Sequence, residues 1–220
     1  MIHLVGVTKY FRTKKSKKYI LRDVTIDIPD GNIGILGRNG AGKSTLMRML
    51  GGIEFPNSGI ISSEHSFSWP LGLGGGFVGS MTAKANVKFV CGLYGKNKEE
   101  TKEIIESVKE FSELENYFDM PIKTYSSGMK GRLGFGLSLA FNFDYMIIDE
   151  TLSVGDAKFR KKAKDALKKK IETCNIILVS HDMKTLEEMC ATGLLVHRGE
   201  LKFFDDISDA INVYKEINKE

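Results

Sequence analysis

Glutamine is absent from the 220 residues of this chain, and cysteine, proline and tryptophan are scarce. The three cysteines (Cys91, Cys174 and Cys190) are odd in number and widely spaced, which is typical of reduced thiols rather than of a disulfide framework or a zinc site. No stretch approaches the roughly 18 apolar residues of a membrane span, so work at a membrane would require a partner. The net charge of +4 is too small for the concentrated basic face of a nucleic-acid-binding protein.

Apolar residues follow two different periods along the chain. Four segments have strand-like patterns, alternating in residues 24–28 and continuously apolar in residues 32–37, 145–149 and 175–180. From about residue 83 to residue 140 the pattern becomes helical. We therefore predict a single α/β domain over residues 1–220. Its strand-rich core spans approximately residues 1–82 and 141–220, and a helical subdomain at approximately residues 83–140 interrupts it.

The segment GRNGAGKST, residues 37–45, has the P-loop pattern and lies between a predicted strand and a predicted helix. Its glycines let the backbone curl into a nest of N–H donors around phosphate oxygens, and the helix N-terminus adds positive potential. Lys43 supplies charge to the β- and γ-phosphates, and Ser44 offers a hydroxyl ligand to Mg²⁺. The strand–loop–helix context disfavours the alternative of a glycine turn that matches by chance. The residues predicted to bind ATP here are Gly37, Arg38, Asn39, Gly40, Ala41, Gly42, Lys43, Ser44 and Thr45.

Two carboxylates end the apolar run YMIIDE at residues 145–150. Asp149 is placed to hold Mg²⁺ together with Ser44, and Glu150 is placed to polarise the attacking water as a general base. The alternative is an acidic strand end that only begins a turn, which the upstream P-loop disfavours. We therefore predict ATP and Mg²⁺ as cofactors and Glu150 as a catalytic residue.

A third motif, TYSSGMKGRLG at residues 124–134, places Ser126, Ser127 and Gly128 at the start of a predicted helix. Small hydroxyl residues and glycine at a helix start allow the backbone to approach an anion closely. Taken alone, this motif is better interpreted as an ordinary N-cap. Lys130 and Arg132 add positive charge, which could equally belong to a solvated surface.

The order of these motifs, with His181 after a further buried strand in ILVSHD, resembles the nucleotide-binding domain of ABC (ATP-binding cassette) transporters. The resemblance covers the whole chain and implies a P-loop NTPase core with an antiparallel β subdomain and an inserted helical subdomain. YSSGM stands where the family signature usually reads LSGGQ. The family pattern assigns a signature of Ser126, Ser127, Gly128 and Met129, a D-loop aspartate at Asp156, a catalytic switch histidine at His181, and an adenine-stacking aromatic at Phe11, with Tyr10 as second choice. For His181 the alternative is a capping or core histidine.

The resemblance also implies a head-to-tail homodimer. Each ATP would lie between the P-loop of one subunit and the signature of the other, so that Ser126, Ser127 and Gly128 contact ATP in trans. His181 would bond the γ-phosphate and help to hold the attacking water. Binding of ATP would close the dimer, hydrolysis would open it, and this motion would drive the membrane subunits.

Three longer segments, FSWPLGLGGGFVGSMT, FSELENYFDMPIKTYSSGM and VGDAKF, look like the ATP-binding subunits of capsular polysaccharide exporters of Gram-negative bacteria. This group resemblance implies an ATPase that powers polysaccharide export with separate integral membrane permease subunits. Such a subunit is peripheral to the cytoplasmic face of the inner membrane, touches the membrane indirectly and has no nucleic acid partner. The alternatives are an ATPase for another polysaccharide, such as O-antigen or teichoic acid, and a soluble ABC ATPase outside transport.

The glycine-rich segment LGLGGGFVGSMT, residues 71–82, occupies the position of the family's Q-loop. We interpret its glycines as a hinge between subdomains, the alternative being a flexible surface loop. The family's glutamine, which senses Mg²⁺ and the γ-phosphate, falls at Val78, whose side chain can do neither. No glutamine elsewhere can replace it, and Ser80 is the closest hydroxyl.

Overall fold

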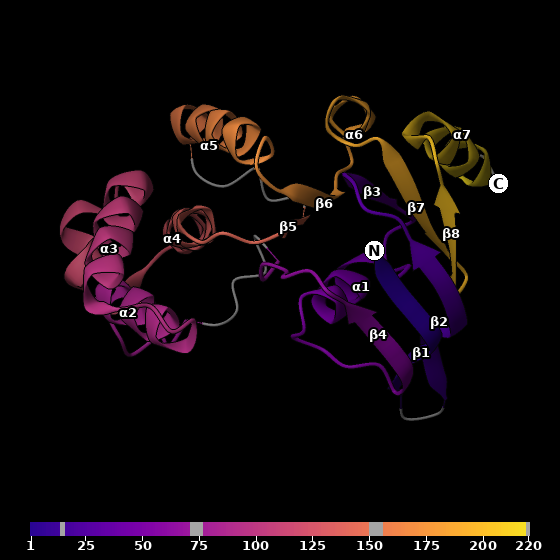
Figure 1. The fold of residues 1–220 in the computed structure, drawn as a ribbon, viewed down its shortest axis with the longest axis horizontal. Helices are drawn as coiled ribbons and strands as arrows, with labels where there is room; N and C mark the ends of the chain where they lie inside the picture. The colour runs from indigo at the N-terminus through magenta and orange to yellow at the C-terminus, as the bar shows by residue number, and fades with distance from the viewer. Residues whose placement is uncertain (14–15, 71–76, 150–155, 219–220) are drawn as a thin grey trace. The chain divides into compact units, whose positions relative to one another are not determined.

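The computed structural model describes residues 1–13, 16–70, 77–149 and 156–218 (Figure 1). Contacts divide the chain into two compact units. The first comprises Met1–Pro70, Phe143–Glu150 and Cys174–Glu220, and the second comprises Leu71–Asn142 and Thr151–Thr173. The helix that follows residue 156 therefore groups with the inserted helices, whereas the sequence division placed it in the core.

The first unit contains two sheets (Figure 1). The three-stranded antiparallel sheet has the order β2 (Lys17–Ile28), β1 (Ile2–Arg12) and β4 (Ser58–Ser63). The five-stranded sheet has the order β5 (Tyr145–Asp149), β6 (Asn175–Val179), β3 (Ile33–Leu36), β7 (Thr192–His197) and β8 (Glu200–Phe204), with only β8 antiparallel to its neighbour. The central strand β3 is buried along its whole length, which explains the continuous apolar runs in the sequence.

Among the described residues, three helices belong to the first unit: α1 (Lys43–Leu50), α6 (Met183–Met189) and α7 (Ile207–Ile217). Helix α1 contributes Leu46, Met47, Met49 and Leu50 to the main apolar core, where they meet buried residues of both sheets. Helix α7 packs closely on the five-stranded sheet because paired glycines lie beneath it. Gly34 and Gly193 face each other across β3 and β7, and a Cβ atom on Gly193 would lie 2.3 Å from the Cβ of Ala210.

The second unit is helical. It comprises α2 (Ala83–Leu93), α3 (Lys98–Ser112), the short 3-10 helices η1 (Glu115–Asp119) and η2 (Ile122–Thr124), α4 (Ser127–Ala140) and α5 (Ala157–Lys170). The side chains of Thr82, Asn97, Ser126 and Asp156 cap the four longer helices, which accounts for where each begins. Within the described part of the chain, none of the helices combines the length and the apolar character needed to cross a bilayer.

Candidate functional site

The phosphate loop connects the end of β3 to the start of α1, as the sequence predicted. Two of its glycines are required by both backbone and space. Gly37 has φ +154°, and a Cβ there would lie 2.6 Å from the carbonyl oxygen of Val196. Gly42 has φ +114°, and a Cβ there would lie 2.2 Å from Cγ2 of Ile20. The loop can therefore keep its tight curvature only with glycine at these positions.

The start of α1 has the features of an anion site. Gly42 occupies the N-cap position and, within the described residues, no side chain caps the helix, so its first N–H groups can bind a ligand. Lys43 Nζ donates to the carbonyl oxygens of Gly37 at 2.7 Å and Arg38 at 3.3 Å, which holds a positive charge beside the loop. Residues Arg38, Asn39 and Gly40 are exposed, whereas Thr45 is buried and accepts a hydrogen bond from Arg48 Nη2 at 3.2 Å. The cradle thus suits a polyphosphate.

Asp149 is the last residue of β5, and His181 follows the carboxyl end of β6, the strand that lies between β5 and β3. Val179 of β6 pairs with Ile35 of β3 on one side and with Asp149 of β5 on the other, so the three residues form one row across the parallel sheet. At about 4.8 Å per strand, Asp149 and Ile35 are roughly 10 Å apart. Gly37 and His181 each lie two residues beyond this row. Ligands of open α/β sheets bind at this edge, outside the carboxyl ends of the strands.

The side chain of Asp182, next to His181, fixes the loop at the start of α6. Asp182 is the N-cap of α6 and accepts from the backbone N–H of Lys184 at 3.1 Å and from the Thr185 hydroxyl at 2.8 Å. His181 itself is exposed and is not a core histidine. Glu150, the predicted general base, lies outside the described residues.

The two candidates for adenine stacking lie near the end of β1. The Tyr10 ring already contacts two other side chains. Its centroid lies 5.5 Å from that of Tyr19 and 4.3 Å from Lys17 Nζ. Phe11 is 42% exposed, and Lys9 Nζ lies 5.4 Å from its ring centroid. Phe11 therefore has more surface free for a flat ligand than Tyr10.

The predicted signature residues form the N-terminus of α4 in the second unit. Ser126 is the N-cap, and its hydroxyl accepts from the Met129 N–H at 3.2 Å. Ser126 and Ser127 are exposed, while Tyr125 just before them is buried and donates its hydroxyl proton to the carbonyl oxygen of Tyr117. The buried Tyr125 side chain thus fixes the position of the exposed start of α4. The N-cap interpretation is correct, and it is compatible with anion binding by the neighbouring N–H groups.

Val78 is held by its backbone. Its N–H donates to Asn86 Oδ1 at 2.7 Å and its carbonyl oxygen accepts from Asn86 Nδ2 at 3.2 Å, while its side chain is 43% exposed. Asn86 is 1% exposed and also donates to the Thr82 carbonyl at 2.9 Å. Sequence reasoning missed Asn86, although a single amide in the apolar face of a helix was a usable signal. Residues 71–76, the first half of the predicted glycine hinge at residues 71–82, lie outside the described residues.

Asp156, at the D-loop position, is the N-cap of α5 and accepts from the Phe159 N–H at 2.9 Å. Arg132 Nη2 donates to its other carboxylate oxygen at 2.7 Å. These contacts, led by the backbone N–H of Phe159, hold the pKa of Asp156 below its usual value. Arg132, which the sequence left open as solvated surface, therefore has a specific partner.

Residues 21–153 match the family model described as ABC transporter. The chain is 51% identical over 217 residues to the polysialic acid transport ATP-binding protein KpsT of Escherichia coli, covering 98% of this chain and 99% of that protein. It is 41% identical to the capsule polysaccharide export ATP-binding protein CtrD of Neisseria meningitidis serogroup B, covering 99% and 100%. A solved dimer of the ATP-binding cassette MJ0796, bound to ADP and Pi, shares the fold with a TM-score of 0.77 at 20% identity over 94% of this chain and 99% of that chain. The predicted fold class is confirmed.

Proposed function

This chain belongs to the ABC transporter family, and we propose that it is the ATP-binding and ATP-hydrolysing subunit that powers export of a capsular polysaccharide across the inner membrane. One observation carries the ATPase activity: the phosphate loop, Asp149 and His181 follow the carboxyl ends of neighbouring parallel strands, in register across β6. The substrate class is supported by similarity over nearly the full length to proteins of polysialic acid transport and capsule polysaccharide export.

Each predicted site residue has a role in the proposal. The N–H groups of residues 37–45 bind the phosphates, Lys43 neutralises part of their charge, and Phe11 stacks on adenine. The hydroxyl of Ser44 and the carboxylate of Asp149 would hold Mg²⁺, which when bound supplies charge neutralisation at the phosphate oxygens. Glu150 accepts a proton from the attacking water, and His181 bonds the γ-phosphate.

The subunit works as a head-to-tail homodimer attached to integral membrane permease subunits. The exposed start of α4 supports this, because Ser126, Ser127, Gly128 and Met129 lie in a different unit from the phosphate loop of their own chain. In the dimer they would bind the nucleotide held by the second copy. The permease contact places the subunit at the cytoplasmic face of the inner membrane, as a peripheral protein.

The test is ATP turnover by the complex purified with its membrane subunits. Glu150→Gln should lower kcat by about 10²-fold or more while ATP binding is kept, since a general base contributes about that much. Lys43→Met should instead weaken ATP binding, and Lys202→Met, which removes an exposed lysine of β8, should change neither.

Two results would contradict the proposal. Equal rates near background for the unsubstituted complex and for Glu150→Gln would exclude an ATPase. Normal capsule on cells that carry only the Glu150→Gln form would exclude the export role, even if turnover in the purified complex fell as expected.

A further inference from the structure

We propose that Arg132, on the second turn of α4, is a positioning residue that fixes Asp156 and the first turn of α5 relative to the signature residues. The inference rests on the proposed function, through which the signature and the D-loop position receive their roles. In this proposal the Arg132 guanidinium alone keeps the starts of α4 and α5 in a fixed relative position.

The contact between Arg132 and Asp156 is direct. Arg132 Nη2 donates to Asp156 Oδ2 at 2.7 Å, while Asp156 Oδ1 accepts from the backbone N–H of Phe159 at 2.9 Å. The guanidinium carbon lies 4.6 Å from the centroid of the Phe159 ring, and that ring is buried. One carboxylate oxygen therefore caps α5 and the other is bound to α4. Together the three residues form a closed set of contacts that orients the guanidinium plane.

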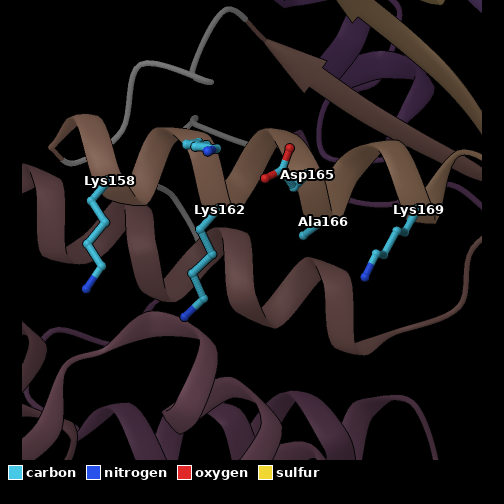
Figure 2. A pocket seen from close by; sticks show the side chains of 6 residues that line it. Lys158, Lys162, Asp165, Ala166 and Lys169 are labelled. Atoms are coloured by element: carbon cyan, nitrogen blue, oxygen red, sulfur yellow. The ribbon is translucent and has the colours of Figure 1, made fainter.

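A second set of contacts, which does not involve Asp156, joins the end of α3 to both α5 and α4 through Glu113. Glu113, the C-cap of α3, accepts from Lys162 Nζ at 2.8 Å, and its other carboxylate oxygen lies 3.6 Å from Arg132 Nη1. Lys162 also donates to the carbonyl oxygen of Phe111 at 3.0 Å. Figure 2 shows Lys162 extending away from the α5 ribbon; it lines an open depression of about 450 Å³ with Lys158, Lys161, Asp165, Ala166 and Lys169. Lys162 thus holds α5 against α3 and offers a natural control for Arg132.

The two side chains of the Arg132–Asp156 pair differ in how far they are exposed to solvent. The Arg132 side chain is 18% exposed, whereas that of Asp156 is 65% exposed. Because the carboxylate faces solvent, the pair adds little to global stability. Its effect is directional: it sets where Asp156 stands relative to Ser126 and Ser127, six and five residues before Arg132 on the chain. Small misplacements of groups that meet in a catalytic interface have large effects on rate.

Two conservative substitutions, one at each end, isolate the contact between Arg132 and Asp156. Asp156→Asn keeps an oxygen that can cap α5, because asparagine is as good an N-cap as aspartate, but it loses the charge that Arg132 binds. Arg132→Lys keeps the charge but loses the planar fork and the stacking on Phe159. In the complex with its membrane subunits, each should lower kcat about tenfold, since positioning and not chemistry is removed. ATP binding at the phosphate loop, measured with a labelled nucleotide on the complex, should stay the same within about twofold, since the loop lies in the other unit.

The matched control is Lys162→Met, which removes the contact between Lys162 and Glu113 and leaves the Arg132–Asp156 contact intact. Its kcat should stay within about twofold of the unsubstituted complex, as expected for a partly exposed ion pair. Two residues that act through each other are non-additive, so Arg132→Lys with Asp156→Asn should be no slower than the slower single variant. Hydrogen exchange on the same complexes supplies a readout besides activity: the first turns of α4 and α5 should exchange faster in Asp156→Asn and unchanged in Lys162→Met.

Three results would overturn the inference. One is a kcat of Arg132→Lys equal to that of Lys162→Met. Another is a loss in the double variant equal to the product of the single losses. The third is unchanged exchange at both helix starts in Asp156→Asn. Failure of the proposed function looks different, because the unsubstituted complex itself would then lack turnover while the exchange result still tested the contact.

Discussion

At the scale of single residues, the side chain of Val78 can be changed without disturbing the fold. Its backbone N–H and carbonyl are both bound by Asn86, and 43% of its surface is exposed. Glutamine at this position therefore has room, and it adds an amide that can bind a metal-held water or a phosphate oxygen. We expect Val78→Gln to raise the ATPase rate or the transport coupling of the complex by about two- to tenfold, equivalent to roughly 1 kcal/mol of added interaction.

The measurement is ATP turnover together with polysaccharide export by the same preparation. Val78→Leu is the control, since it changes size without adding a polar group. If Val78→Gln behaves like Val78→Leu in both assays, the side chain at this position does not act as the sensor.

At the scale of elements, the substitution of glycine by alanine should have opposite effects on stability at two positions, Gly193 and Gly92. At Gly193 on β7, an added Cβ would lie 2.3 Å from Ala210 of α7, so Gly193→Ala must push the helix off the sheet. Overpacking of this kind costs about 1–3 kcal/mol. At Gly92, in the last turn of α2, an added Cβ meets nothing within 4 Å, and Gly92→Ala should stabilise by about 0.5 kcal/mol because alanine is the better helix former.

Thermal unfolding of the two variants checks this pair. Gly193→Ala should lower Tm by about 2–12 °C, and Gly92→Ala should raise it by about 1–2 °C, given about 2–4 °C per kcal/mol for a chain of this size. A Tm for Gly193→Ala at or above that of the unsubstituted protein would show that α7 does not need the close approach.

Elements whose cause is local could be predicted from the sequence, and contacts between distant elements could not. Strands β3, β5 and β6 each contain a continuous apolar and buried run of four residues, as expected when both faces of a sheet are covered, and that pattern is visible without a structure. The phosphate loop could be predicted because its glycines adopt positive φ angles, which are a local property of the backbone that favours glycine. Arg132 and Asp156 are 24 positions apart, and Lys162 and Glu113 are 49 apart. Such pairs meet only after α3, α4 and α5 have packed, so spacing carries no signal for them.

At the scale of the whole molecule, the proposed function assigns complementary halves of a nucleotide site to the two units of one chain. The phosphate loop and Asp149 belong to the first unit, and the exposed serines at the start of α4 belong to the second. If a second copy completes the site, ATP should bring two copies together, and blocking hydrolysis should keep them together. With Glu150→Gln and ATP, we therefore expect a dimer of this subunit in analytical ultracentrifugation, and a monomer when ATP is left out.

A large side chain at the start of α4 should prevent that dimer without weakening ATP binding. Ser127→Arg fills the exposed helix start that the second copy's phosphates would approach, whereas the loop around Lys43 is untouched. The matched control is Ser208→Arg, the same change on the exposed first turn of α7 in the other unit. In the Glu150→Gln background, Ser127→Arg should raise the concentration needed for ATP-driven dimerisation by about tenfold or more, equivalent to about 1.4 kcal/mol, and Ser208→Arg should not. Equal dimerisation of both variants would mean that the start of α4 does not face the partner's nucleotide, so the two halves of the site would not be joined by a head-to-tail arrangement.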